Sequence, residues 1–158
     1  MEYRIGQGLD IHAIQAGLKM RLCGVEVAAD RGFVAHSDGD VALHALCDAL
    51  LGAAGLGDIG VHFPDTDPAY RGIDSSVLLS KVRRMISDDG WSVVNADITI
   101  ELQSPKIAAF VPQMKRRVAE MLGVEESVVN VKATTTERLG AVGRGEGCVA
   151  HAIVLLSR

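Results

Sequence analysis

The sequence predicts an α+β fold, in which a mixed β-sheet has its helices packed on one face. Apolar residues repeat at helical spacing in some segments and alternate with polar residues in others, and glycines, prolines and aspartates separate these segments. Strands and helices interleaved in this order are typical of one sheet covered by helices. The length of 158 residues suits a single domain covering residues 1–158.

The first third of the chain predicts a strand, a hairpin and a helix. Residues 3–12 form a strand pattern that two glycines interrupt, and residues 20–27 read as a short hairpin. A helix is expected to open in segment 37–40, where Ser37 is a good N-cap and two aspartates suit the positive end of the helix dipole. It should end at Gly52, where a glycine-rich loop begins.

The middle of the chain predicts a loop, a helix and a strand. Prolines and aspartates make residues 63–68 a loop. Residues 75–88 are amphipathic and predict a helix, and residues 93–102 alternate as a half-buried strand does. The expected apolar stripe of the helix is Val77, Leu78, Val82, Met85 and Ile86. The expected buried face of the strand is Ala96, Ile98, Ile100 and Leu102.

The last third predicts one more helical region and two strands. Residues 105–122 are expected to be helical with an interruption at Pro112. Residues 128–133 and 148–156 read as strands, and the glycines of segment 140–147 predict a turn between them.

Composition argues against two classes of partner. A net charge of −4 disfavours nucleic acid, which calls for a basic patch, and aromatic residues at 4% leave little material for stacking bases. No apolar run approaches the roughly 20 residues that cross a bilayer, and the N-terminus has no signal-peptide pattern. Cys23, Cys47 and Cys148 form no C-x-x-C pair, so we expect small buried hydrophobes in a cytoplasmic protein.

Asp10 and His12 begin a candidate metal site. Residues two apart in a strand point to the same side, so the pair would present an oxygen and a nitrogen together. His44 from a facing helix would complete three ligands, and three protein ligands with one open position are typical of catalytic zinc. Asp48, one turn further along the helix, is expected to bond the second imidazole nitrogen. In the alternative account His12 is solvated and His44 is an ordinary core histidine.

Two further segments suit phosphate groups. His36 precedes the expected helix start, where backbone N–H groups bind anions, although capping by Ser37 explains the same residues. After strand 128–133, Thr134 to Thr136 offer hydroxyls and amides, and Glu137 offers a carboxylate for a hard divalent ion. Threonine is also a good strand former, and Glu137 alone is compatible with a surface charge.

Glycines surround one arginine and one aspartate. Arg144 lies in segment 143–147, which matches neither a Walker A motif nor G-x-G-x-x-G. A turn or bulge accounts for that segment, whereas an arginine between glycines also suits a binding site that needs close backbone approach. Asp58 lies in a second glycine-rich loop, which could contact a sugar hydroxyl.

Six segments together resemble one family. They are Arg4–Ala13, Ala35–Ala45, Leu56–Gly60, Phe63–Pro68, Asn130–Glu137 and Gly143–Gly147. In this order, and nearly end to end, they are similar to the 2-C-methyl-D-erythritol 2,4-cyclodiphosphate synthase family of the non-mevalonate isoprenoid (terpenoid) pathway. The resemblance implies a homotrimeric lyase with active sites between subunits. Its substrate would be 4-diphosphocytidyl-2-C-methyl-D-erythritol 2-phosphate, whose 2-phosphate attacks the β-phosphorus, so that CMP leaves and a cyclic diphosphate forms.

The resemblance also implies roles for the metal-binding and catalytic residues. Asp10, His12 and His44 match the ligands of one zinc ion per subunit. Glu137 matches the residue beside a second divalent ion, Mg²⁺ or Mn²⁺, that bridges the diphosphate. The positions that stabilise the transition state are matched by His36 and Thr135.

Further residues match the family's substrate contacts. Asp58 and Gly60 match ribose contacts, and Ser37 and Asp65 match contacts to the erythritol portion. The cytidine pocket corresponds to residues 102–106 together with 132–135. The other residues expected to bind substrate are Phe63, Leu102, Lys106, Lys132, Thr134 and Arg144.

Two positions depart from the family's pattern. Gln7 stands where many members carry histidine, outside the ligand set, so little effect is expected. Ala141 stands where relatives often place phenylalanine, beside Arg144, in an axial cavity sometimes credited with an isoprenoid diphosphate; that ligand is therefore not carried over here.

Two other functions fit parts of the pattern: a metal-dependent phosphohydrolase on the same ligands, and a non-catalytic trimer that binds isoprenoid diphosphates through Arg144.

Overall fold

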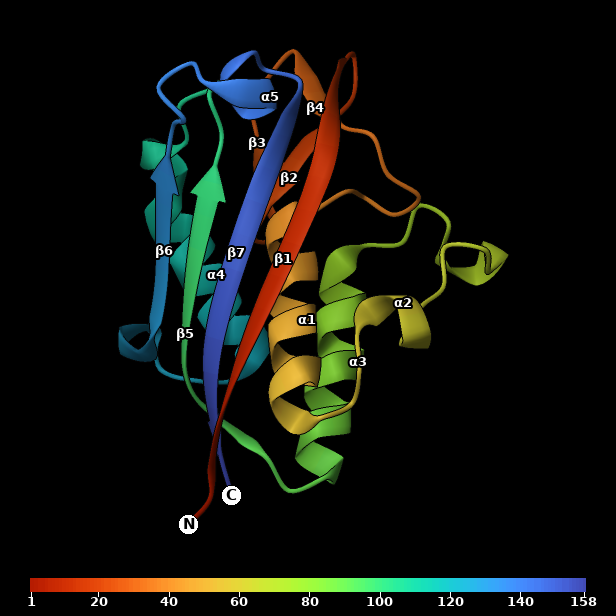
Figure 1. Cartoon of the computed structure of the whole chain (residues 1–158), viewed down its shortest axis with the longest axis vertical. Coiled ribbons are helices and arrows are strands. Elements are labelled where there is room, and N and C mark those ends of the chain that lie inside the picture. The colour runs from red at the N-terminus through yellow and green to blue at the C-terminus, as the bar shows by residue number, and fades with distance from the viewer.

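The computed structural model describes residues 1–158 and is built on a five-stranded sheet in the order β4-β1-β7-β5-β6 (Figure 1). Strands β5 and β6 are parallel and the other neighbours are antiparallel, so the sheet is mixed as predicted. The strands of this sheet are β1 (Tyr3–Ala16), β4 (Arg31–Phe33), β5 (Ser92–Glu101), β6 (Val129–Thr134) and β7 (Gly147–Ser157). A separate two-stranded ribbon pairs β2 (Met20–Leu22) with β3 (Val25–Val27).

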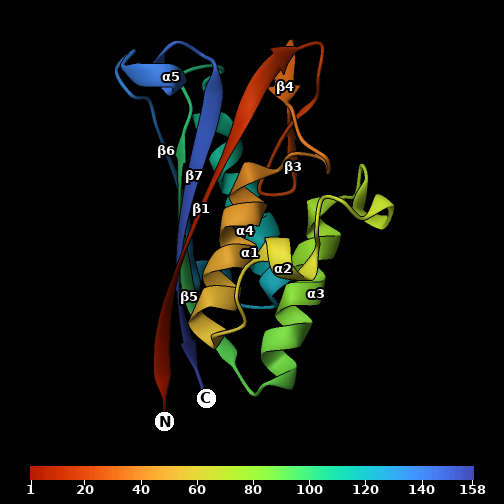
Figure 2. The same ribbon diagram turned by 45° about the vertical axis from the view of Figure 1, so that its right-hand side comes forward.

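Three longer helices cover one face of the sheet, which confirms the predicted layering (Figure 2). Helices α1 (Val41–Ala54) and α4 (Val111–Leu122) contact the strands, and α3 (Ser75–Asp88) packs against both helices. None of them combines the length and apolar character that crossing a membrane requires. The shorter helices are α2 (Ile59–His62), α5 (Gly140–Gly143) and three 3₁₀ turns at Pro68–Tyr70, Ala108–Phe110 and Glu126–Val128.

Two glycines bring α1 against β1 at backbone distance. A Cβ on Gly8 would lie 1.8 Å from the Ala45 carbonyl oxygen, and one on Gly6 would lie 2.0 Å from that of Ala49. Only a residue without a side chain fits such a contact. The glycines that interrupt the strand pattern therefore let the helix settle onto the strand, and this places His44 opposite Asp10 and His12.

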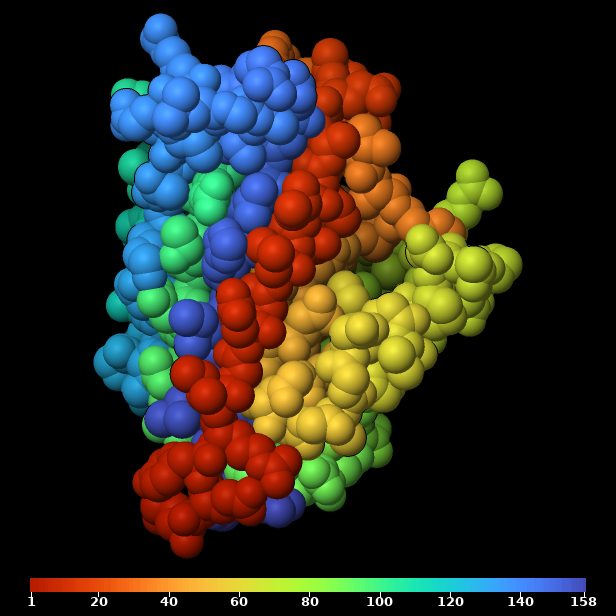
Figure 3. All heavy atoms as spheres, in the orientation of Figure 1, coloured from red at the N-terminus to blue at the C-terminus, as the bar shows by residue number.

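The core lies between the sheet and the helices. It forms one cluster of 37 buried residues, which includes the predicted face of β5 and all three cysteines. None of the three longer helices covers the opposite face of the sheet (Figure 1), where the atoms of β1 lie at the surface (Figure 3) and large apolar side chains are exposed. These are Tyr3, Ile5, Leu9, Ile11 and Ile153. Burying the helix side alone thus leaves β1 and β7 with an apolar outer surface.

Some predicted details differ from the structure. Helix α1 begins at Val41 and is capped by Asp40, whose carboxylate accepts the Leu43 N–H, because Ser37 lies too far before the first turn to cap it. Pro112 belongs to the first turn of α4 and interrupts nothing, since proline needs no N–H partner there. In α3, Val77 is exposed and Leu79 is buried in its place. Strand β4 and the one-turn helices α2 and α5 were not predicted from the sequence.

Candidate metal centre and adjoining pocket

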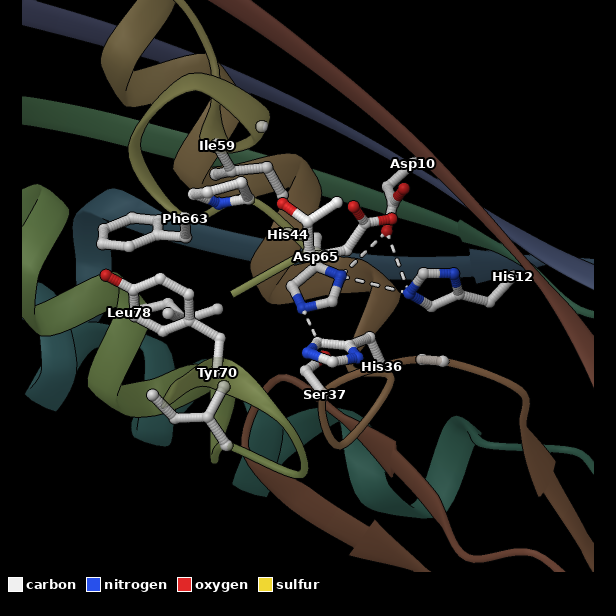
Figure 4. Close-up of a pocket in the computed structure, with 15 residues that line it drawn as sticks. Asp10, His12, His36, Ser37, His44, Ile59, Phe63, Asp65, Tyr70 and Leu78 are labelled. Atoms are coloured by element: carbon white, nitrogen blue, oxygen red, sulfur yellow. Dashed lines mark hydrogen bonds and ion pairs between the residues drawn. The ribbon is translucent and has the colours of Figure 1, made fainter. Parts of the chain in front are cut away.

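Three side chains converge where α1 faces β1 (Figure 4). Asp10 and His12 extend from the same side of β1, as their spacing predicts, and His44 extends from the first turns of α1. His44 Nδ1 lies 3.1 Å from Asp10 Oδ2 and 3.1 Å from His12 Nε2. The third edge, from His12 Nε2 to Asp10 Oδ2, is 3.3 Å. The three atoms form a nearly equilateral triangle with an oxygen and two nitrogens at its corners.

This triangle fits a tetrahedral metal ion such as zinc. With metal–ligand distances of about 2.0–2.1 Å and tetrahedral angles, two donors are separated by roughly 3.3–3.4 Å. The observed edges of 3.1–3.3 Å match that separation. Two imidazoles and one carboxylate are also a donor set that zinc accepts in catalytic sites. These residues can therefore hold a metal ion and leave one corner free for another ligand.

The second nitrogen of His44 has partners that the sequence analysis did not find. His44 Nε2 lies 2.8 Å from Ser75 Oγ and 3.2 Å from Ser37 Oγ. The expected partner, Asp48, instead accepts the backbone N–H of Ile59 at 2.8 Å. Asp48 therefore holds α2 in place, and the prediction that it orients His44 was wrong. The helical spacing of Asp48 from His44 carried no information about α3, which supplies Ser75.

Burial and neighbouring charge act in opposite directions on the two histidines. Burial lowers the pKa of His12 and outweighs the nearby Asp10 carboxylate. For His44, burial also acts to lower the pKa, but the hydrogen bond and negative charge of Asp10 outweigh it and raise the pKa. When His44 is protonated, its Nδ1–H donates to Asp10 and occupies the position that a metal cation would take.

Asp40 is a structural carboxylate rather than a member of the site. It is fully buried and accepts backbone N–H groups of Cys23, Gly24 and Leu43. Burial raises its pKa to about 6, although these hydrogen bonds favour the charged form. Its contacts tie the turn between β2 and β3 to the start of α1, the helix that carries His44.

The triangle of Asp10, His12 and His44, called the metal triangle below, lies in the wall of a pocket of about 440 Å³. Predicted residues that also line this pocket are His36, Ser37, Gly60, Phe63 and Asp65. Figure 4 shows Phe63, Tyr70 and Leu78 on the side of the pocket away from His12, where they form an apolar wall. The lining contains no lysine and no arginine, whereas it contains the carboxylates of Asp10 and Asp65. Among the lining side chains only the histidines can carry positive charge, and the Lys81 ammonium lies 5.9 and 5.3 Å from the ring centroids of Phe63 and Tyr70.

Tyr70 and Leu78 are pocket residues that the sequence analysis missed. The Tyr70 ring packs edge-on against Phe63 at 5.5 Å between centroids. Leu78 was assigned only to the apolar stripe of α3, although it also lines the pocket. The aromatic residue after Asp67-Pro68 was the one available signal for Tyr70, since aromatic side chains in a polar loop need a packing partner. Asp58, a predicted contact, caps α2 by accepting the Val61 N–H and lies beside the lining.

A second group of predicted residues is not brought to this pocket within the chain. Leu102, Lys106, Lys132, Thr134, Thr135 and Glu137 are all absent from its lining. They lie where the parallel strands β5 and β6 end, and all but Leu102 and Thr135 are exposed. Thr135 Oγ1 is 3.4 Å from Glu137 Oε1, and the Lys132 ammonium pairs with Asp97. The structure thus divides the predicted residues between two places.

Arg144, the remaining predicted contact, is paired within its own segment. Its Nε lies 2.6 Å from Glu146 Oε1, and its side chain is exposed just after α5. The guanidinium holds the pKa of Glu146 below its usual range. The glycine-rich run contains the one-turn helix α5 instead of the simple turn that was predicted.

Known proteins resemble this chain over nearly its whole length. A model described as the YgbB family matches residues 3–157. The chain is 58% identical over 156 residues to the 2-C-methyl-D-erythritol 2,4-cyclodiphosphate synthase of Methylococcus capsulatus, and the match covers 99% of each chain. It is 53% identical to a synthase of the same name from Acinetobacter baumannii, with 99% of this chain and 98% of the relative covered.

Solved structures show the same architecture. A 2C-methyl-D-erythritol-2,4-cyclodiphosphate synthase in its CDP-bound form superposes with a TM-score of 0.91 at 38% identity, covering 98% of this chain and 100% of that one. The bifunctional IspDF from Campylobacter jejuni superposes with a TM-score of 0.95 at 42% identity over 98% of this chain. This chain spans 42% of the length of that bifunctional protein.

Proposed function

The chain belongs to the YgbB family, and on that premise we propose that it converts 4-diphosphocytidyl-2-C-methyl-D-erythritol 2-phosphate to 2-C-methyl-D-erythritol 2,4-cyclodiphosphate and CMP. It is then a cyclising phosphorus–oxygen lyase of isoprenoid biosynthesis, acting in the cytoplasm. The observation that carries this proposal is the triangle of Asp10, His12 and His44 in the wall of a pocket without lysine or arginine.

The reaction places one phosphate group against another, and the pocket lining has no lysine or arginine to neutralise them. Unit charges about 4 Å apart repel by roughly 4 kcal/mol at an effective dielectric constant of 20. Asp10 and Asp65 add negative charge to the same space. A zinc ion held by Asp10, His12 and His44 would supply the missing positive charge and polarise the phosphoryl group. The triangle has the dimensions of a zinc site, and the pocket lining lacks lysine and arginine. Both observations therefore favour a metal ion held by these three residues.

The protein's own side chains would position the substrate. The erythritol 2-phosphate is already ionised near neutral pH, because the second pKa of a phosphate monoester is about 6, so no general base is needed. His36 and Ser37 line the pocket beside the metal triangle and are placed to hold this phosphate and the erythritol hydroxyls. Phe63 and Leu78 offer an apolar wall to the carbon skeleton. Orientation of the attacking oxygen toward the β-phosphorus then lowers the barrier.

We propose that the second group of residues acts from a neighbouring copy in a homotrimer. Two observations support this arrangement. The predicted cytidine-binding segments, 102–106 and 132–135, lie outside the pocket of their own chain, and the uncovered sheet face is apolar. Association through that face would bury Ile5 and Ile11 and could bring Thr135 and Glu137 beside another chain's triangle. Glu137 would then help to hold the second divalent ion, and Thr135 would donate to the transferred phosphoryl group.

Product analysis tests the proposed reaction. Purified protein loaded with zinc and magnesium is incubated with the cytidine substrate in ¹⁸O-labelled water, and the products are followed by ³¹P NMR and mass spectrometry. The proposal predicts equimolar CMP and a cyclic diphosphate without ¹⁸O, because the nucleophile belongs to the substrate. A linear phosphate that carries ¹⁸O would identify a phosphohydrolase and refute the cyclisation.

A further inference from the structure

The least expected contact of the candidate metal centre is a series of hydrogen bonds that runs from the buried His44 through the buried Ser75 to the partly buried Asp38. His44 Nε2 lies 2.8 Å from Ser75 Oγ, and the Ser75 hydroxyl bonds Asp38 Oδ1. The backbone N–H groups of Asp40 and Ser75 also donate to the Asp38 carboxylate, at 3.1 and 3.0 Å. Ser75 is fully buried and does not line the pocket, so its hydroxyl is out of reach of a substrate.

The hydrogen bonds of Ser75 and Asp38 determine which ring nitrogen of His44 carries hydrogen. A carboxylate only accepts, so the single hydrogen of the Ser75 hydroxyl goes to Asp38. The Ser75 oxygen must then accept from His44, which places a hydrogen on Nε2. In neutral His44 the lone pair is therefore on Nδ1, the atom 3.1 Å from both Asp10 Oδ2 and His12 Nε2. A lone pair on Nδ1 and the Asp10 carboxylate repel each other, so a cation between them favours this tautomer.

We propose that Ser75 and Asp38 are positioning residues that hold His44 in the metal-binding tautomer and aim Nδ1 at the ion. This inference rests on the proposed zinc site but is separate from the reaction. Ser37 cannot replace Ser75 in this role, because its oxygen lies further from His44 Nε2, at 3.2 Å, and also accepts the Gly39 N–H. Partners beyond the ligands typically change metal affinity by roughly 10- to 100-fold when they are removed.

Zinc affinity, measured by competition with a chelating indicator, tests the role of Ser75. Ser75→Ala should weaken zinc binding by roughly 10-fold or more relative to the unchanged protein. The matched control is Ser80→Ala, the same change at an exposed position of the same helix, and it should bind zinc as the parent does. Asp38→Asn should weaken binding in the same direction but less, because an amide oxygen can still accept from Ser75 while it carries no charge.

A spectroscopic measurement separates positioning from general loosening of the fold. In the zinc-loaded protein, the Nε2–H of His44 should give an imidazole resonance protected from exchange with water, and Ser75→Ala should lose that protection. Zinc affinity equal to that of Ser80→Ala, with the resonance intact, would overturn the proposal. Should Ser75→Ala fail to fold, Asp38→Asn decides by the same two measurements. A parent protein that binds no zinc would refute the proposed metal site itself, and the role of Ser75 with it.

Discussion

Replacing Gly8 with alanine should damage the fold and the metal centre together. The new Cβ would lie 1.8 Å from the Ala45 carbonyl oxygen, whereas ordinary contact begins at 3.4 Å. The difference, 3.4 minus 1.8, requires α1 and β1 to separate locally by 1.6 Å. Both partners are backbone atoms, so no side-chain rotation can relieve the contact. Overpacking of this kind costs about 1–3 kcal/mol, and a backbone clash belongs at the upper end.

The same displacement reaches the metal triangle, because His44 is adjacent to Ala45 in α1. Its Nδ1 atom now lies 3.1 Å from Asp10 Oδ2. A shift of 1.6 Å is half of that edge, so the three donors no longer enclose a zinc ion. We expect Gly8→Ala to lower the melting temperature of the metal-free protein by roughly 6–12 °C, taking about 3 kcal/mol and 2–4 °C per kcal/mol. Zinc affinity should fall with it.

Gly52→Ala provides the matched control. Gly52 lies inside α1, where an added Cβ would lie 3.9 Å from the Gln7 carbonyl oxygen, an ordinary van der Waals contact, so alanine fits there without a clash. The change should stabilise the protein by roughly 0.5–1 kcal/mol, since alanine is the better helix former. Thermal unfolding in chelator and zinc competition measure both effects. A Gly8→Ala protein that has the same melting temperature as Gly52→Ala and binds zinc equally well would refute the idea that close packing of α1 on β1 sets the geometry of the site.

Three further predictions concern the site. His12→Ala should lose zinc and activity together, because two ligands remain of three; full zinc stoichiometry in that variant, measured by elemental analysis, would disprove the assignment. In the metal-free protein, the raised pKa of His44 means that the folded state holds a proton more tightly than the unfolded state, so stability should fall as pH rises from 6.5 through that pKa. Thermal melts against pH should lose this slope in Asp10→Asn, and a retained slope would exclude the His44–Asp10 pair as its source. Thr135→Ala should reduce kcat by roughly 10²-fold with a smaller change in KM, if Thr135 stabilises the transition state; steady-state kinetics that show neither effect would leave Thr135 a structural residue.

Local patterns were sufficient for the predictions that depend on few neighbours in the chain. The alternation of β5 placed Ala96, Ile98 and Ile100 in the core, and the two-residue spacing of Asp10 and His12 put both on one side of β1. These predictions succeeded because strand periodicity is a property of the backbone itself. His44 was predicted as the third ligand from its place in a helical segment, the family resemblance agreed with that choice, and the structure confirms that it meets the other two.

Predictions about orientation and partners failed where distant segments competed for the same group. Helical spacing favoured Asp48 as the partner of His44, but α3 brings Ser75 to that nitrogen and α2 occupies Asp48. Ser37 had the right chemistry for a cap, and Asp40 took that position while also accepting N–H groups from the turn at Cys23. A hydrogen-bonding group has several eligible partners in the sequence, and only packing decides which of them is near.

The sequence alone determined most of the strands, the three longer helices and the choice of Asp10, His12 and His44 as candidate metal ligands, because these follow from short-range periodicity and side-chain chemistry. Tertiary structure decided that Gly6 and Gly8 are points of contact with a helix and not breaks in a strand. It also decided that the metal triangle and the residues around Thr135 occupy different places on one chain. Such outcomes depend on how whole elements pack against each other, and that packing is a sum over many distant contacts which no local segment contains.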